Sequence, residues 1–164
     1  MFGLETARSG RFEIFKRIRL EALRAAPEAF ASSASDWESL PDEEWRRRLT
    51  TNPVVVSFRG EEPVGIMGLM RQQGSKMAHR ATIIMVYLRD SERGGGHAVA
   101  MLNLLLDHAR ASGIRQVELA VSAENPAAIR FYQREGFHEI GCIPAGFLHE
   151  GREIDEIVMA RRLT

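Results

Sequence analysis

The sequence predicts an α/β (α+β) fold, with a central mixed sheet of about six or seven strands flanked by about four helices. Short apolar runs rich in Val, Ile and Tyr are typical of strands, and longer segments with apolar residues three or four positions apart are typical of helices. After residue 80 the two kinds of segment alternate, which favours parallel strand pairing there. The predicted order is βααβββαβαββ, and 164 residues suffice for one domain, 1–164, with its own core.

Composition narrows the class of protein. The chain is 45% hydrophobic and 27% charged, with 22 basic and 22 acidic residues, so neither a nucleic acid nor a membrane is an expected partner. Its single cysteine, Cys142, allows no intrachain disulfide and no cysteine-based metal site. The first residues lack the layout of a signal peptide, and no window is apolar enough to span a membrane. We expect a cytoplasmic protein without a metal, either a monomer or a homodimer.

Apolar spacing and helix-breaking residues define the elements of the first half. Phe15 and Ile18 share one face of a helix. Pro41 followed by acids is typical of a first helical turn, which would turn Trp45 and Leu49 toward the core. The expected elements are a strand at 2–7, a helix at 12–23, a loop or short helical pieces at 27–40, a helix from 41, a strand at 54–58 and its hairpin partner at 64–70.

The second half reads as regular alternation. A β-rich run leads into a glycine turn and a helix, and Gly113 suits the position just after that helix ends. Gly151 marks the turn of a closing hairpin. The expected elements are a strand at 80–88, a helix at 96–111, a strand at 116–121, a helix at 125–135, and strands at 137–143 and 154–160.

The segment Arg93-Gly94-Gly95-Gly96-His97-Ala98 joins the run 83–88 to the helix and predicts an anion site. Glycines let the backbone approach a ligand closely, and the first N–H groups of a helix lie at the positive end of its dipole. A Walker loop is excluded because no Lys or Ser/Thr follows the glycines, and the match to a dinucleotide fingerprint is poor. A flexible turn before a helix remains the alternative.

A second motif downstream, taken with the glycine loop, indicates a family resemblance. Arg93, Gly96 and Ala98 fit the pattern (Gln/Arg)-x-x-Gly-x-(Gly/Ala), and the segment 125–137 has an Asn opening a helix that ends in Tyr-x-x-x-Gly-Phe. In these two motifs the chain resembles the GCN5-related N-acetyltransferases, the GNAT family. The resemblance implies the GNAT fold and acetyl-coenzyme A (acetyl-CoA) as cosubstrate.

The resemblance also implies where the donor binds. The loop would hold its pyrophosphate, and the end of the preceding strand, splayed from its neighbour by a bulge, would pair with the pantetheine arm. Asn125 would lie beside that arm, although an N-cap also explains it. Tyr132 would protonate the departing thiolate, with a core aromatic as the alternative. The implied cofactor-binding residues are Val86, Tyr87, Leu88, Arg93, Gly94, Gly95, Gly96, His97, Ala98, Asn125 and Tyr132.

The acceptor would enter between the first two helices, their loop and the last two strands. The segment between Ala25 and Trp45 holds acids but no Lys or Arg, so an acidic loop could attract a cationic amine. The segments 19–30 and 151–156 resemble the corresponding parts of a bacterial GNAT subgroup of mostly unassigned substrate. No general base is assigned. The candidate acceptor residues are Glu28, Asp36, Glu38, Asp155 and Glu156.

Three functions follow for testing. The leading hypothesis is an N-acetyltransferase that passes the acetyl group directly to a primary amine of a small molecule or peptide. No acetyl-enzyme is expected, because Cys142 falls after the second motif. The first alternative is a GNAT-like module that binds coenzyme A for sensing or regulation, since the long central strand carries no carboxylate. The second is a nucleotide-binding α/β protein.

Overall fold

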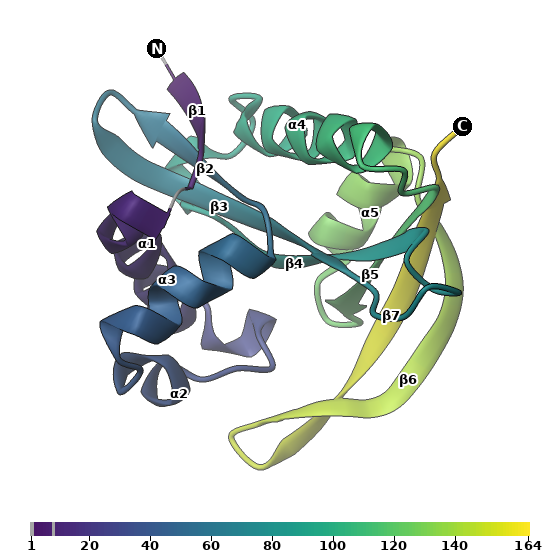
Figure 1. Ribbon diagram of the computed structural model, residues 1–164. Helices are drawn as coiled ribbons and strands as arrows, with labels where there is room; N and C mark the ends of the chain where they lie inside the picture. The colour runs from purple at the N-terminus through teal and green to yellow at the C-terminus, as the bar shows by residue number, and fades with distance from the viewer. Residues whose placement is uncertain (1, 8) are drawn as a thin grey trace.

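The computed structural model describes residues 2–7 and 9–164, which form one seven-stranded mixed sheet in the order β1-β2-β3-β4-β5-β7-β6 (Figure 1). Among the described strands only β4 and β5 pair in parallel, so the parallel pairing expected after residue 80 is confirmed for that pair alone. The strand β6 follows β5 and α5 in the chain, but β7 inserts between β5 and β6 and pairs antiparallel with both. The strands are β1 (Phe2–Thr6), β2 (Val54–Arg59), β3 (Glu62–Arg71), β4 (Arg80–Leu88), β5 (Gln116–Ser122), β6 (His138–His149) and β7 (Arg152–Arg162).

Helices cover both faces of the sheet, three on one face and two on the other (Figure 1). Successive residues of β2 serve the two layers in turn: Val54 and Val56 pack under α1 and α3, and Val55 packs on the α4 side. The helices are α1 (Phe12–Ala25), α2 (Ala34–Glu38), α3 (Asp42–Thr51), α4 (His97–Ala111) and α5 (Pro126–Arg134), with single 3₁₀ turns at Ser9–Arg11, Pro27–Ala29 and Asp90–Glu92. No helix in the described part of the chain is long and apolar enough to cross a membrane.

The layer of α1, α2 and α3 is built on aromatic side chains. Phe15 and Trp45 are fully buried and lie edge to face with ring centroids 5.4 Å apart. Trp37, from α2, packs against Trp45 with the ring centroids 5.2 Å apart. The helical spacing of Phe15 and Ile18 and the inward position of Trp45 and Leu49 are therefore confirmed.

The segment 27–40, expected as a loop or short helical pieces, contains a 3₁₀ turn and the short α2. A capping box starts α2: the Ser33 hydroxyl accepts from the Asp36 N–H, and the Asp36 carboxylate accepts from the Ser33 N–H. The final hairpin is longer than expected, because β6 runs on to His149 and β7 begins at Arg152. Most of β6 is exposed, so its outer half lacks the alternating apolar pattern that marks a strand in sequence.

Candidate active site

The strands β4 and β5 pair at one end only. Their register consists of Arg80 with Gln116, Ala81 with Val117 and Thr82 with Glu118. At this closed end the Arg80 guanidinium donates two hydrogen bonds of 2.5 Å to the Glu118 carboxylate. These bonds, more than any other contact, hold the pKa of Glu118 below its usual value. Beyond Thr82 the two strands separate, so the rest of β4 has a backbone edge that β5 does not cover.

A bulge in β4 accompanies the separation. The register with β3 shifts by one residue between the pairs Ile66–Tyr87 and Gly68–Ile84, and Met85 has a φ of 58°. A left-handed conformation is uncommon outside glycine and marks local strain. The Met85 side chain lies against Gly68, where a Cβ would come within 2.8 Å of its Cε. The bulge that the resemblance implied is therefore present.

A cleft of about 810 Å³ passes through this gap and reaches both helical layers. Its walls include consecutive residues of β4, from Thr82 to Leu88, and the end of β5, from Leu119 to Ser122. One end is lined from α4, α5 and the glycine loop, and the other from α1, α2 and α3. The structure brings most of the predicted donor-site residues together on this lining, namely Val86, Tyr87, Leu88, Arg93, Gly94, Ala98, Asn125 and Tyr132, but not Gly95, Gly96 or His97.

The glycine loop delivers the N-terminus of α4 to the cleft. Gly94 and Gly96 have φ values of 79° and 89°, and a Cβ added to either would meet no heavy atom within 4 Å. Gly96 is the N-cap residue and supplies no side-chain acceptor, so the first N–H groups of the helix are not capped. Such N–H groups at the positive end of a helix suit a phosphate.

His97 anchors the loop from beneath. Its side chain is buried and does not line the cleft. Nδ1 hydrogen-bonds with the Ser57 hydroxyl on β2, and Nε2 lies 3.3 Å from Glu92 Oε2. Glu92 also binds Arg59, and this hydrogen bond is the main reason that its pKa is lowered. The His97 side chain is therefore not available to an anion in the cleft, and only its backbone N–H could contribute. The negative charge of Glu92 is compensated by Arg59 and by its contact with His97.

Asn125 is the N-cap residue of α5, and Tyr132 lies in the last turn of this helix. The Asn125 amide oxygen accepts from the Ala128 N–H at 3.1 Å, which confirms the N-cap, while the residue also lines the cleft. Tyr132 is only 4% exposed and packs edge to face with Phe131 and Phe137, so it belongs to the core and to the cleft wall at once. Burial raises the pKa of Tyr132 and keeps the phenol neutral. Within the described residues its hydroxyl forms no hydrogen bond.

The two roles of Asn125 can be separated. We expect Asn125→Ala to lower the free energy of unfolding by about 1 kcal/mol, because the Ala128 N–H loses its acceptor. Asn125→Ser keeps a capping oxygen and should restore most of that stability. Denaturant unfolding measures the first effect, and the KM for acetyl-CoA measures the second. A rise in KM in both variants indicates a donor contact, whereas unchanged KM in both reduces Asn125 to a cap.

The end of the cleft lined by α1, α2 and α3, where the acceptor is expected to enter, is basic and not acidic as the sequence predicted. Arg19, Arg47 and Arg48 line it, together with the aromatic rings of Phe30 and Trp37. The three acids proposed for this region lie outside the lining for local reasons: Asp36 caps α2, Glu38 pairs with Arg24, and Glu28 is exposed in a 3₁₀ turn.

Glu156 is the one carboxylate among the described residues of the lining. It lies on β7, opposite a second bulge in which β6 gains two residues between Ile143 and Phe147. A Cβ at Gly146 would come within 2.7 Å of the Glu156 side chain, so this contact requires a glycine. Asp155 does not line the cleft, and its Oδ1 accepts from the Ala145 N–H.

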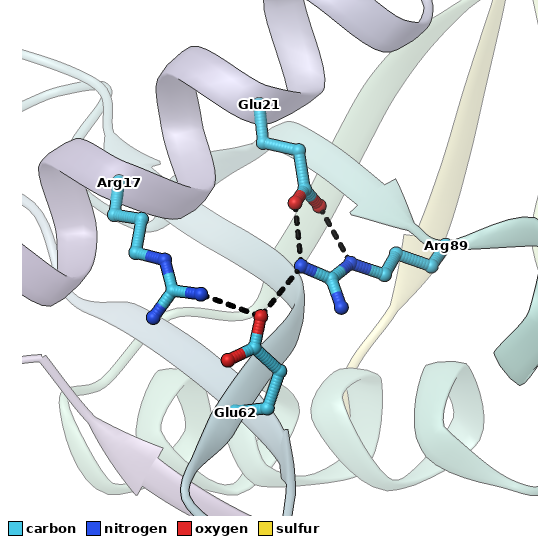
Figure 2. Close-up of polar contacts among 4 residues, drawn as sticks. All are labelled: Arg17, Glu21, Glu62 and Arg89. Atoms are coloured by element: carbon cyan, nitrogen blue, oxygen red, sulfur yellow. Dashed lines mark hydrogen bonds and ion pairs between the residues drawn. The ribbon is translucent and has the colours of Figure 1, made fainter.

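Charged side chains tie α1 to the end of β4 (Figure 2). The guanidinium of Arg89, just after β4, donates to both oxygens of Glu21 at 2.5 and 2.9 Å. It also donates to Glu62 at 2.9 Å, and Glu62 in turn pairs with Arg17 at 2.6 Å. The two carboxylates raise the pKa of Arg89. This network fixes the helix that carries Arg19 beside the strand edge that carries Tyr87.

Sequence reasoning missed Arg19 and the aromatic rings around it. The signal was present: Arg19 lies four residues after Phe15, on the face of α1 that is otherwise apolar. An arginine in such a stripe is unusual, since charged residues are seldom fully buried without a partner. Phe30 and Trp37 belong to the segment 27–40. Its apolar residues follow no clear helical or strand period, so the sequence does not separate inward from outward positions there.

Comparisons with known proteins agree with this geometry. The model of the acetyltransferase (GNAT) family matches residues 18–137. An L-methionine sulfoximine/L-methionine sulfone acetyltransferase of Pseudomonas paraeruginosa is 36% identical over 78 residues, 48% of this chain and 45% of that protein. The matched segment thus spans less than half the length of that relative.

Solved structures resemble the whole chain. A GNAT-family acetyltransferase of Streptococcus pneumoniae superposes with a TM-score of 0.86 at 20% identity, covering 100% of both chains. The Salmonella typhimurium protein yncA, solved with its cofactor acetyl-CoA, gives a TM-score of 0.82 at 20% identity, covering 100% of this chain and 95% of that one. At such identities these likenesses establish the fold.

Proposed function

The chain belongs to the acetyltransferase (GNAT) family, and on that premise we propose that it transfers the acetyl group of acetyl-CoA to a primary amine of a small molecule or peptide. The observation that carries the proposal is the gap between β4 and β5, with its left-handed bulge at Met85, opening onto the uncapped N-terminus of α4. A pantetheine arm needs a free strand edge, and a pyrophosphate needs N–H donors. The free edge of β4 and the loop before α4 lie along one cleft.

In this proposal one end of the cleft binds the donor and the other end binds the acceptor. The backbone of 86–88 and of the glycine loop holds and orients the donor, while α1, α2, α3 and the last hairpin receive the acceptor. Glu156, the carboxylate of the lining, holds the amine and accepts its proton. The Tyr132 hydroxyl, neutral and without a partner among the described residues, donates a proton to the sulfur that leaves.

Direct transfer suits the position of the chain's one thiol. Cys142 lies on the exposed β6 and does not line the cleft, so we assign it no acetyl-enzyme role. The proposal further places the reaction in the cytoplasm and assigns residues 1–164 to one catalytic domain.

Ligand-dependent stability tests the donor site. A ligand at 100 times its Kd adds about 2.7 kcal/mol to the free energy of unfolding. We expect acetyl-CoA and coenzyme A at this excess to raise the melting temperature by the amount that this stabilisation implies. We expect ATP and NAD to leave the melting temperature unchanged. Equal shifts from ATP or NAD would instead support a nucleotide-binding protein. A screen of amines with thiol release as the readout then separates an enzyme from a module that only binds the cofactor.

A further inference from the structure

Arg19 is a buried cation with unsatisfied donors. The residue is 4% exposed, and neither Nε nor Nη1 has a hydrogen-bond partner among the described residues. The other two arginines of this wall differ, because Arg47 and Arg48 both donate to Glu44 on their own helix. Burial and the nearby Arg48 charge lower the pKa of Arg19 to about 10, so the group stays charged at neutral pH. A buried guanidinium that keeps its charge is normally paired.

Aromatic rings hold Arg19 in place but do not satisfy it. Its guanidinium carbon lies 4.5 Å from the Trp37 ring centroid and 5.0 Å from that of Phe30. Such contacts stabilise the positive charge through the ring faces. They supply no acceptor for the N–H groups, which lie in the plane of the guanidinium. The rings instead fix a planar donor group in the wall of the cleft.

The cleft offers a complementary pair of charges from separate elements. Arg19, on α1, and Glu156, on β7, both line it. The neighbouring walls of Phe15, Phe30 and Trp37 are apolar, which strengthens any charge–charge contact between them and a ligand. A molecule with an ammonium group for Glu156 and an oxyanion for Arg19 would satisfy both.

Resting on the proposed function, we propose that the acceptor amine carries an anionic group, a carboxylate in particular, that binds Arg19: the acceptor is an amino acid. The planar donor fork of arginine matches a carboxylate through paired hydrogen bonds. Arg48, whose guanidinium carbon lies 4.2 Å from the centroid of the same Trp37 ring, adds to the positive potential. The side chain of the amino acid would meet the apolar walls.

Binding measurements test this without depending on turnover. Protein saturated with coenzyme A is titrated calorimetrically with the common amino acids, each beside its C-terminal amide, which has the amine but not the negative charge. The pH is held near 6.5, below the roughly 7.7–8.0 pKa of an α-amino group beside an amide. The carboxylate of a free amino acid raises that pKa further, so both amines are protonated. Taurine and aminomethylphosphonate distinguish a carboxylate from other oxyanions.

We expect at least one amino acid to bind about tenfold or more tightly than its amide, a difference of about 1.4 kcal/mol. Arg19→Met should bring that ratio to near one, and Arg19→Lys should retain part of it. The matched control is Arg24→Met on the same helix, whose side chain is 58% exposed and pairs with Glu38 outside the cleft. It should keep the full ratio.

The outcomes separate this proposal from the function on which it rests. Retained binding of coenzyme A shows that Arg19→Met is folded; if that variant fails to fold, the wild-type ratio and Arg19→Lys still decide. Equal binding of acids and amides by the wild type, or stronger binding of taurine or aminomethylphosphonate than of any amino acid, overturns the assignment. Turnover of amides as well as acids would then leave the acetyltransferase function standing. Binding of acids without thiol release would support the Arg19 site and count against the function.

Discussion

Replacing Tyr132 by Phe is expected to lower kcat by about 10²- to 10⁴-fold, the usual contribution of a positioned general acid. This range equals about 3–5 kcal/mol of activation free energy at 1.36 kcal/mol per decade. Only the hydroxyl is lost, so the edge-to-face contacts with Phe131 and Phe137 remain. Because the proton is needed as charge builds on sulfur, binding of acetyl-CoA should change little.

Steady-state kinetics and acetyl-CoA titration of the same preparation provide the measurement. The melting temperature serves as a control, since the hydroxyl has no partner within the described residues whose loss would unfold the protein. If kcat stays within a few-fold of the wild type, Tyr132 is a core aromatic that happens to border the cleft, and water becomes the proton source.

Replacing Gly94 by Glu is expected to weaken acetyl-CoA binding by about 100-fold or more, which corresponds to about 2.8 kcal/mol at 1.4 kcal/mol per decade. Gly94 lines the cleft in the loop before α4, and a carboxylate there would repel a pyrophosphate and occupy its space. A side chain at a φ of 79° also strains the backbone, so a control must share that strain.

Gly74 offers the matched control. It lies in the turn between β3 and β4, has a φ of 90° and, like Gly94, has open space where a Cβ would be added, with no heavy atom within 4 Å. Gly74→Glu therefore adds the same charge and a similar strain away from the cleft, and should leave the Kd for acetyl-CoA unchanged. Gly94→Gln separates charge from bulk. An unchanged Kd in Gly94→Glu would move the phosphate site away from this loop.

The sequence predicted the parts of the molecule whose signals are local. The glycine loop, the N-cap at Asn125 and the inward faces of α1 and α3 depend on spacing within a few residues, and all were placed correctly. The insertion of β7 between β5 and β6 depends on pairing between distant segments, so a predicted order of elements did not contain it. The bulge at Met85 came from resemblance, because no residue type in β4 demands a left-handed backbone there.

The charge of the acceptor end was the clearest error. Counting acids between Ala25 and Trp45 ignored where each carboxylate would find its partner, and in the folded chain those partners are a helix N-terminus, an arginine on α1 or solvent. The arginines at this end of the cleft come from the amphipathic helices α1 and α3. In sequence, a cation on the inner face of such a helix looks like a surface residue. Net composition of a segment thus says little about the potential of the surface it borders.

The unpaired edge of β4 has a consequence for how such a chain can change over generations. On the proposed assignment the donor is bound by main-chain atoms of a strand and of a helix N-terminus. Most residue types at 86–88 would provide these main-chain groups equally well. On the same proposal the acceptor is recognised by individual side chains that line the cleft, such as Arg19, Trp37 and Glu156. Substitutions therefore fall unequally: many leave the donor end intact, while a few at the other end redirect the enzyme to a new amine. Such an unequal effect of substitutions is compatible with a fold that this chain shares with the Streptococcus pneumoniae protein at 20% identity.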